Sequence, residues 1–247
     1  HQLGYLTDAK HAAISSACTQ LIAGKHHDQF IVDMIQGGAG TSTNMNANEV
    51  IANLALESMG KEKGEYSFLH PNNDVNMAQS TNDAYPTAIR VGLLLGHNDL
   101  LVSLERLIDA FSAKGDEFSH VLKMGRTQLQ DAVPMTLGQE FKAFSANLAG
   151  DLVRLKSLAN DLFTSVNLGG TAIGTGINAD PRYQGIAVER LHSICGFPMK
   201  AAPDLIEATS DMGSFVLFSA MLKRTAVKLS KICNDLRLLS SGPRTGI

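Results

Sequence analysis

The sequence has 247 residues, which is enough to bury a substantial core in one or two domains. It carries 21 Lys and Arg residues against 24 Asp and Glu residues, a formal net charge of -3, and has no basic cluster. This balance gives no support to a nucleic-acid groove or a polybasic membrane surface. We therefore expect small molecules and other protein subunits as partners.

The cysteines indicate a reducing compartment. Cys18, Cys195 and Cys233 are an odd number, lie far apart and form no C-x-x-C pair, which argues against a disulfide framework and a zinc site. We expect a cytoplasmic protein without metal or cofactor. No run approaches the roughly 18 apolar residues of a membrane span, and the N-terminus lacks a signal-peptide pattern. The missing initiator Met and the loop-like residues 241–247 indicate a fragment.

Helical periodicity dominates the first part of the chain. Apolar residues three and four apart predict an amphipathic helix over 7–24, capped by Thr7 or Asp8. A second helix is predicted over 49–57, with its end at Gly60. Residues 60–76 are rich in Lys, Gly, Pro and Asn, so we expect a domain boundary near residue 78.

Three longer apolar stripes follow, over 89–111, 141–166 and 215–236. Helices of about 25–30 residues are unusual in a globular domain, where the mean is about a dozen, and they predict a bundle. The expected fold is mainly α, a helical-bundle domain over 79–247 preceded by a smaller helical domain over 1–78. Apolar surface left over within one chain would be buried against identical subunits, so we expect an oligomer.

Three stretches rich in hydroxyl and amide side chains, 37–46, 79–86 and 125–131, precede helical patterns. Free N–H groups and the positive dipole end at a helix start attract anions. Neutral donors can also recognise carboxylates without leaving a buried cation when the site is empty. We expect the three stretches to converge on one small dicarboxylate. The donors concerned are Thr41, Ser80, Thr81, Asn82 and Thr127.

Such a site suits the removal of a proton from the carbon next to a carboxylate. The electrons then move onto the carboxylate oxygens, and each preorganised donor contributes roughly 3 to 4 kcal/mol to that state. The sequence shows no G-x-S-x-G elbow and no obvious acid–base pair of carboxylates. The pattern therefore predicts binding and charge stabilisation rather than nucleophilic catalysis.

Simpler explanations stand beside this interpretation. An equal alternative is that Ser42 and Thr43 only cap the following helix and take no part in a binding site. Arg126 is either a further anchor or one partner of a structural ion pair. The glycines of 37–40 lack the Lys-Ser/Thr of a phosphate loop, and the glycine-rich stretch 167–178 follows a helix rather than a strand, so neither predicts nucleotide binding.

Several of these segments resemble the aspartase/fumarase superfamily of lyases. They are 40–46 (GTSTNMN), 79–83 (QSTND), 125–127 (GRT) and 170–176 (GTAIGTG), and they occur in the family's order and spacing over nearly the whole chain. Segments 123–140, 204–211 and 231–244 are most similar to the branch that eliminates ammonia from aspartate. Gln128 stands where the fumarate-hydrating branch typically carries His.

The resemblance implies a carbon–nitrogen lyase that converts L-aspartate to fumarate by reversible anti elimination through an aci-carboxylate. The substrate would be bound by Thr41, Ser80, Thr81, Asn82 and Thr127, with Gln128 beside the leaving ammonia. The family's base is a Ser on a G-S-S-x-M-P-x-K-x-N loop that these 247 residues do not contain, so no catalytic residue is assigned. We expect the 247-residue chain alone to be inactive.

The resemblance also implies assembly and leaves alternatives open. Family members are homotetramers in which each active site draws segments from three subunits, so we expect a homotetramer here. His70-Pro71-Asn72 resembles an accessory dicarboxylate site of fumarases. The alternatives are a class II fumarase that interconverts fumarate and malate, and a non-catalytic scaffold, since the superfamily also includes lens crystallins.

Overall fold

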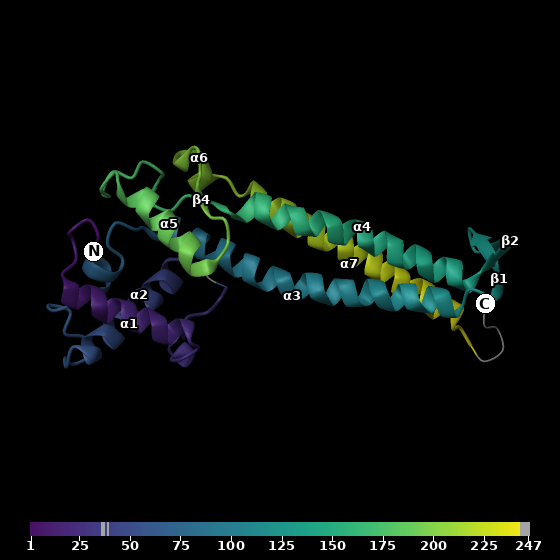
Figure 1. Cartoon of the computed structure of the whole chain (residues 1–247), viewed down its shortest axis with the longest axis horizontal. Coiled ribbons are helices and arrows are strands. Elements are labelled where there is room, and N and C mark those ends of the chain that lie inside the picture. Colours follow the sequence, from purple (N-terminus) through teal and green to yellow (C-terminus); the bar gives the residue numbers. More distant parts are fainter. Residues whose placement is uncertain (36–37, 39, 243–247) are drawn as a thin grey trace. The chain divides into compact units, whose positions relative to one another are not determined.

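The computed structural model describes residues 1–35, 38 and 40–242, and it is mainly helical (Figure 1). The chain forms two compact units. The first comprises residues 1–91 and 164–211, and the second comprises 92–163 and 212–247. We expect a single domain boundary near residue 78, whereas these two units divide the chain after residues 91, 163 and 211. The boundary near residue 78 stays a prediction. None of the helices in the described ranges has the length and hydropathy needed to cross a membrane.

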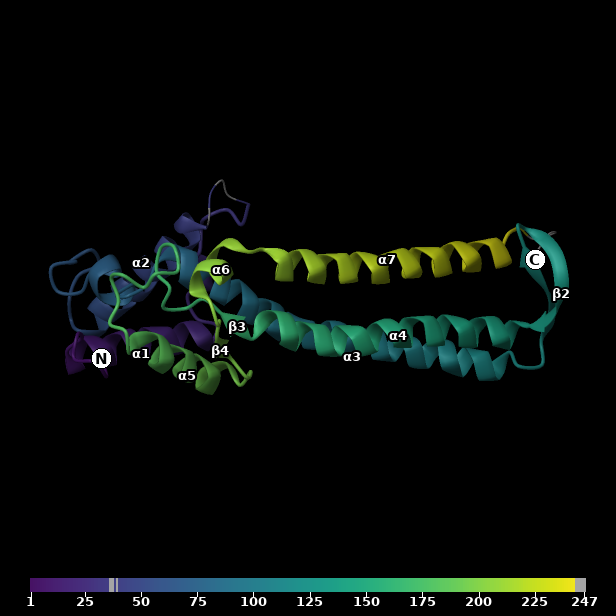
Figure 2. The same ribbon diagram turned by 90° about the horizontal axis from the view of Figure 1, so that it is seen from above.

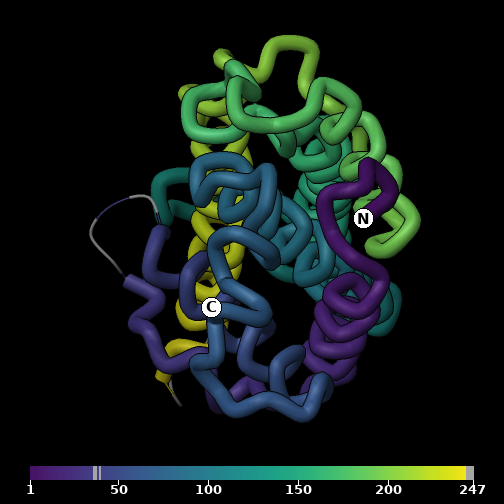
Figure 3. The backbone as a smooth tube through the Cα atoms, turned by 90° about the vertical axis from the view of Figure 1, so that its left-hand side faces the viewer, coloured from purple at the N-terminus to yellow at the C-terminus, as the bar shows by residue number. Residues whose placement is uncertain are grey.

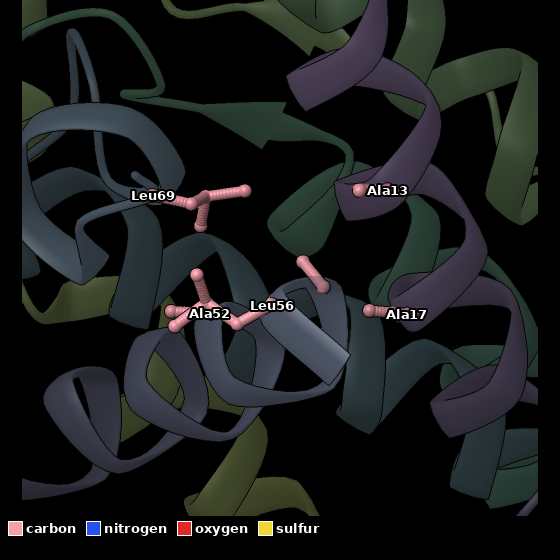
Figure 4. Packing of buried hydrophobic residues seen from close by; sticks show 6 residues of the cluster. Ala13, Ala17, Ala52, Leu56 and Leu69 are labelled. Carbon is pink, nitrogen blue, oxygen red and sulfur yellow. The ribbon is translucent and has the colours of Figure 1, made fainter. Parts of the chain in front are cut away.

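Two N-terminal helices form the core of the first unit. Helix α1 (Asp8–Ile22) begins after Thr7, whose side chain accepts a hydrogen bond from the Lys10 N–H, as expected. Helix α2 (Thr41–Ser58) begins earlier than the sequence suggested. Alanines line the contact between the two helices, and the buried cluster is shown in Figure 4. Its members are Ala13, Ala17, Ala52, Ala55, Leu56 and Leu69.

The rest of the first unit consists of short elements and loops. A 3₁₀ turn η1 (His27–Gln29) and a π-helical turn η2 (Pro71–Val75) lie in its N-terminal part. The segment 164–211, green in Figure 3, adds helices α5 (Tyr183–Cys195) and α6 (Leu205–Ser210). Strands β3 (Ser165–Val166) and β4 (Lys200–Ala201) pair in parallel within this segment. The sequence pattern predicts none of these short elements, and the apolar stripe expected to be helical as far as Val166 leaves the helix at Phe163.

Long helices dominate the second unit. Helices α3 (Thr81–Glu117), α4 (Leu137–Phe163) and α7 (Gly213–Leu239) contain 37, 27 and 27 residues. Figures 1 and 2 show α4, α7 and the part of α3 in this unit running along a common direction. Their shared core contains Phe144, Leu148, Leu155, Phe218 and Ile232. The expected fold class, a mainly α protein with a long-helix bundle, is confirmed.

A β-hairpin connects α3 to α4. Strands β1 (Leu122–Thr127) and β2 (Gln130–Thr136) pair antiparallel with Thr127 opposite Gln130, which leaves a two-residue turn at Gln128–Leu129. Both turn residues have positive φ, 51° and 62°, as a type I′ hairpin turn requires. The stretch 125–131 thus lies in a hairpin and precedes α4, which begins at Leu137. Pro134 and the β-branched residues around it favour extended backbone over helix.

Candidate functional site

The first component of the site is the start of α2. Thr41 is the first residue of the helix, and Gly40 is its N-cap with φ 84° and no side-chain cap. Ser42 and Thr43 lie inside the first turn, so the alternative that they merely cap this helix is wrong. A Cβ on Gly40 would lie 2.1 Å from the Tyr85 ring, so only glycine fits there. Gly37 and Ala39 of the predicted stretch lie outside the described residues.

The second component is the start of α3, which is closed by a capping box. The Ser80 Oγ accepts a hydrogen bond from the Asn82 N–H at 3.2 Å, while the Asp83 Oδ1 accepts one from the Ser80 N–H at 2.9 Å. The Ser80 hydroxyl proton is not consumed by this cap. It therefore stays available to donate to a bound anion.

Side-chain amides join the starts of these two helices. Asn44, in the first turn of α2, donates from Nδ2 to the Thr81 Oγ1 at 3.1 Å and to the Asn76 Oδ1 at 3.3 Å. Asn48, one turn further along α2, donates to the same Asn76 oxygen at 3.2 Å. Two helix N-termini thus lie next to each other in the first unit, and the positive ends of their dipoles favour an anion between them.

The third component is the glycine-rich loop after β3. The Asn82 side chain donates to the Ala172 carbonyl at 2.7 Å. Pro86 lies inside α3 and has no N–H to give to the carbonyl four residues earlier, that of Asn82. The Asn167 Nδ2 donates to that carbonyl instead, at 2.9 Å. The loop therefore completes the first turns of α3.

Asp83 forms the most buried link between α3 and this loop. Its carboxylate is 0% exposed, and the Oδ2 accepts hydrogen bonds from the Gly169 N–H at 3.2 Å and the Thr171 N–H at 2.8 Å. Burial raises the pKa of Asp83, and the backbone donors partly oppose this rise. Neither Asp83 nor Asn167 is among the site residues predicted from the sequence. The S-x-x-D spacing of Ser80 and Asp83 was the available signal for the first of them.

A buried cation lies two turns further along α3. Arg90 is 6% exposed; burial lowers its pKa, while the carboxylates of Asp211 and Glu207 raise it. The 204–211 segment, quoted above for its resemblance, therefore supplies the negative charge that balances a buried guanidinium.

The structure brings four of the predicted binding residues together. Thr41, Ser80, Thr81 and Asn82 stand at the two adjoining helix starts of the first unit. Thr127 and Gln128 belong to the hairpin of the second unit, where both are exposed. Next to them the Arg126 Nε lies 3.4 Å from the Asp131 Oδ1 across the hairpin, which favours the structural ion pair of the two roles considered for Arg126.

The residues near the accessory-site motif make local contacts. The His70 Nδ1 accepts hydrogen bonds from the Asn72 and Asn73 N–H groups at 3.0 and 3.3 Å, and so caps η2. Asp74 accepts from the Lys10 ammonium at 2.7 Å. The accessory dicarboxylate site stays a prediction. Within the described part of the chain, no three His, Cys, Asp or Glu side chains cluster closely enough to hold a metal ion.

Comparisons with known proteins agree on one family. A family model described as lyase matches residues 1–247. The aspartate ammonia-lyase of Pseudomonas canavaninivorans is 78% identical over 246 residues, which are 100% of this chain and 52% of that protein. That of Helicobacter pylori is 57% identical over the same share of each chain. The chain spans about half the length of these relatives.

Solved structures agree in fold. A fumarate lyase, delta crystallin, from Brucella melitensis, determined with cobalt bound, is 60% identical with a TM-score of 0.97 and is matched over 99% of this chain and 53% of that one. The class II fumarase of Schistosoma mansoni is 32% identical with a TM-score of 0.91, over 99% and 54%. Since the family model covers the entire sequence, this chain belongs to that lyase family, as its resemblance to the aspartase/fumarase superfamily implied.

Proposed function

We propose that the protein is an aspartate ammonia-lyase, which converts L-aspartate to fumarate and ammonia. The observation that carries this proposal is the meeting of two helix N-termini lined with neutral donors, linked through Asn44 and Thr81 at 3.1 Å. The relatives named aspartate ammonia-lyase, 78% identical over the whole chain, support the same reaction.

The proposed reaction is an anti elimination. A base removes one proton from the carbon between the carboxylate and the amino-bearing carbon, and the electron pair moves onto the carboxylate oxygens. The C–N bond then breaks, ammonia leaves with the electrons of that bond, and the double bond of fumarate forms. Thr41, Ser80, Thr81 and Asn82 donate hydrogen bonds to the substrate and so stabilise the aci-carboxylate. By the family resemblance, the base is a Ser on a loop that these 247 residues do not contain.

Thr127 and Gln128 are proposed as further binding residues, supplied by the β1–β2 hairpin. Gln128 would lie beside the leaving ammonia, and its amide does not titrate. In the proposed homotetramer, each active site draws segments from three subunits. Large apolar side chains exposed on α7 support burial against identical subunits; they include Val216, Leu217 and Val227. We place the protein in the cytoplasm, in line with its three unpaired cysteines.

The full-length protein provides the test of this function. Fumarate absorbance is followed with L-aspartate and, separately, with L-malate as substrate. We expect fumarate from aspartate alone. Turnover of malate alone would favour the fumarase, and turnover of neither would favour a non-catalytic scaffold.

A hydroxyl deletion tests the site itself. Thr81→Val removes one proposed donor and should lower kcat/KM for aspartate about 100-fold, the usual effect of losing one oxyanion donor. Thr19→Val is the matched control, because the Thr19 side chain is exposed and, among the described residues, its hydroxyl bonds only the Ser15 carbonyl within α1. Equal kinetics of the two variants would refute the assignment of Thr81.

A further inference from the structure

Asp83 has an unusual environment for a carboxylate with no exposed surface. Its bonding partners among the described residues are backbone N–H groups rather than cations. The Oδ1 faces the Ser80 N–H at the start of α3, and the Oδ2 faces the Gly169 and Thr171 N–H groups of the loop. One side chain therefore bridges the start of α3 and a distant loop, since Gly169 and Thr171 lie 86 and 88 residues after Asp83 in the sequence.

The direction of these hydrogen bonds defines the chemistry at this position. Every neighbour is a donor, so both oxygens must accept, and an ionised carboxylate is the side chain that offers acceptors on both sides. An amide of the same shape would turn its NH₂ group toward one set of donors. Either the part-buried Ser80 N–H or the buried loop N–H groups would then lose their acceptor.

We propose that Asp83 is a positioning residue of the active site, whose ionised carboxylate ties the Gly169–Thr171 loop to the start of α3 and thereby fixes Asn82. This inference rests on the proposed function, in which Asn82 binds the substrate. Asn82 is held through its side chain by the Ala172 carbonyl and through its own carbonyl by Asn167. Both partners belong to the loop that Asp83 anchors, so Asn82 keeps its orientation only while that anchor holds.

Kinetics of the full-length enzyme separate positioning from simple stability. Asp83→Asn should raise KM for aspartate at least about tenfold, because the binding donors lose their preorganised geometry. A purely structural role would lower the folded fraction, so that kcat falls while KM stays constant. Asp204→Asn is the control, since Asp204 also accepts two backbone N–H groups, at the cap of α6, where Asn serves equally well.

Hydrogen exchange provides a readout that does not need activity. The amides of Gly169 and Thr171 should exchange faster in Asp83→Asn than in the wild type, and at the wild-type rate in Asp204→Asn. Asp83→Ser, which is smaller and keeps one acceptor, is the second variant if Asp83→Asn does not fold. It should show an increase in KM and in exchange of the same two amides.

The outcomes distinguish this inference from the function on which it rests. An unchanged KM, or a loss of kcat at constant KM, in a folded Asp83 variant of an active enzyme overturns the positioning role. Unchanged exchange of Gly169 and Thr171 overturns the tie itself. A wild-type protein that does not consume aspartate overturns the proposed function instead, and the exchange comparison then still decides whether Asp83 anchors the loop.

Discussion

At the residue scale, Gly40 controls how closely α2 approaches α3. We predict that Gly40→Ala in the full-length protein destabilises the fold by about 2 kcal/mol or more and raises KM for aspartate, because the new methyl group meets the Tyr85 ring. Gly24→Ala is the matched control, since Gly24 has the same φ of 84° but open space around its Cβ position. Gly24→Ala should lower the free energy of unfolding only by the backbone strain, about 1 kcal/mol. Urea unfolding and aspartate kinetics measure both effects.

His97 in α3 predicts a pH dependence of stability. It is 6% exposed, its Nε2 lies 3.0 Å from the Leu155 carbonyl, and burial lowers its pKa below the ordinary 6.5, partly opposed by that hydrogen bond. The unfolded chain therefore takes up this proton first as the pH falls. The contribution of His97 is present above pH 6.5 and is lost as the pH falls through the lowered folded pKa.

The measurement is the free energy of unfolding at pH 7.5 and 5.5. His97→Gln keeps a donor for the Leu155 carbonyl but does not titrate, so its stability should fall less between the two pH values than that of the wild type. His120→Gln, at an exposed position, should behave like the wild type. Parallel pH profiles for all three proteins would contradict the role of His97.

Single residues also show how far the sequence alone could lead. The sequence alone could place several predicted binding residues near helix starts, because short polar side chains ahead of an apolar stripe indicate such a start. These residues are Thr41, Ser80, Thr81 and Asn82. Asp83 shares that pattern locally, but its partners Gly169 and Thr171 lie 86 and 88 residues away. Periodicity and spacing contain no information about such a distant pairing, so its bridging role required the structure.

At the scale of elements, the β1–β2 hairpin holds a strained turn. Leu129 has φ 62° and is 72% exposed, so Leu129→Asn should stabilise the protein by about 1 kcal/mol without affecting activity. Gln128→Gly relieves a similar strain at φ 51° but removes the proposed ammonia-side group. It should leave stability unchanged or raised while kcat/KM falls. Thermal unfolding and kinetics of both variants test this, and full activity of Gln128→Gly would contradict its assignment.

A buried ion pair joins α4 to α7. Asp151 is 0% exposed, and its Oδ1 lies 2.7 Å from the Lys228 Nζ and 3.1 Å from an Arg224 nitrogen. Lys228→Met should lower the free energy of unfolding by about 2 kcal/mol, because it leaves a buried charge unpaired. In the double variant Asp151→Leu with Lys228→Met, the free energy of unfolding should lie within about 1 kcal/mol of the wild-type value. Lys231→Met, which breaks a pair between a 70% exposed Lys231 side chain and Asp235, is the control and should change stability by less than about 0.5 kcal/mol.

The long helices were predictable and the short elements were not. Apolar stripes sustained over many turns identified α3, α4 and α7, because only a helix places those residues on one face. Helix α6 and the two-residue strands β3 and β4 are too short for a periodic signal, whereas α5 and the hairpin were not among the predictions. Gln128 and Leu129 also lack the Asn-Gly or Asp-Gly pattern that usually marks a hairpin turn.

At the scale of the whole molecule, we predict that the purified 247-residue chain does not convert aspartate to fumarate. It spans about half the length of its relatives and lacks the Ser loop that the family resemblance assigns as the base. Fumarate absorbance with millimolar aspartate, compared with the full-length protein at equal concentration, measures this. Turnover by the 247-residue chain above the uncatalysed rate would show that another residue can act as base.

The hydrogen bond from Asn167 to the carbonyl that Pro86 leaves without a helical partner has a consequence for biosynthesis. Its two ends are 85 residues apart, and the intervening chain contains most of α3, the hairpin and α4. During translation, the N-terminal helices emerge long before the loop that completes them. The nascent first unit therefore stays incomplete until the ribosome has synthesised residues 164–211. In that interval, the polar groups at its helix starts would hydrogen-bond to water or be covered by chaperones.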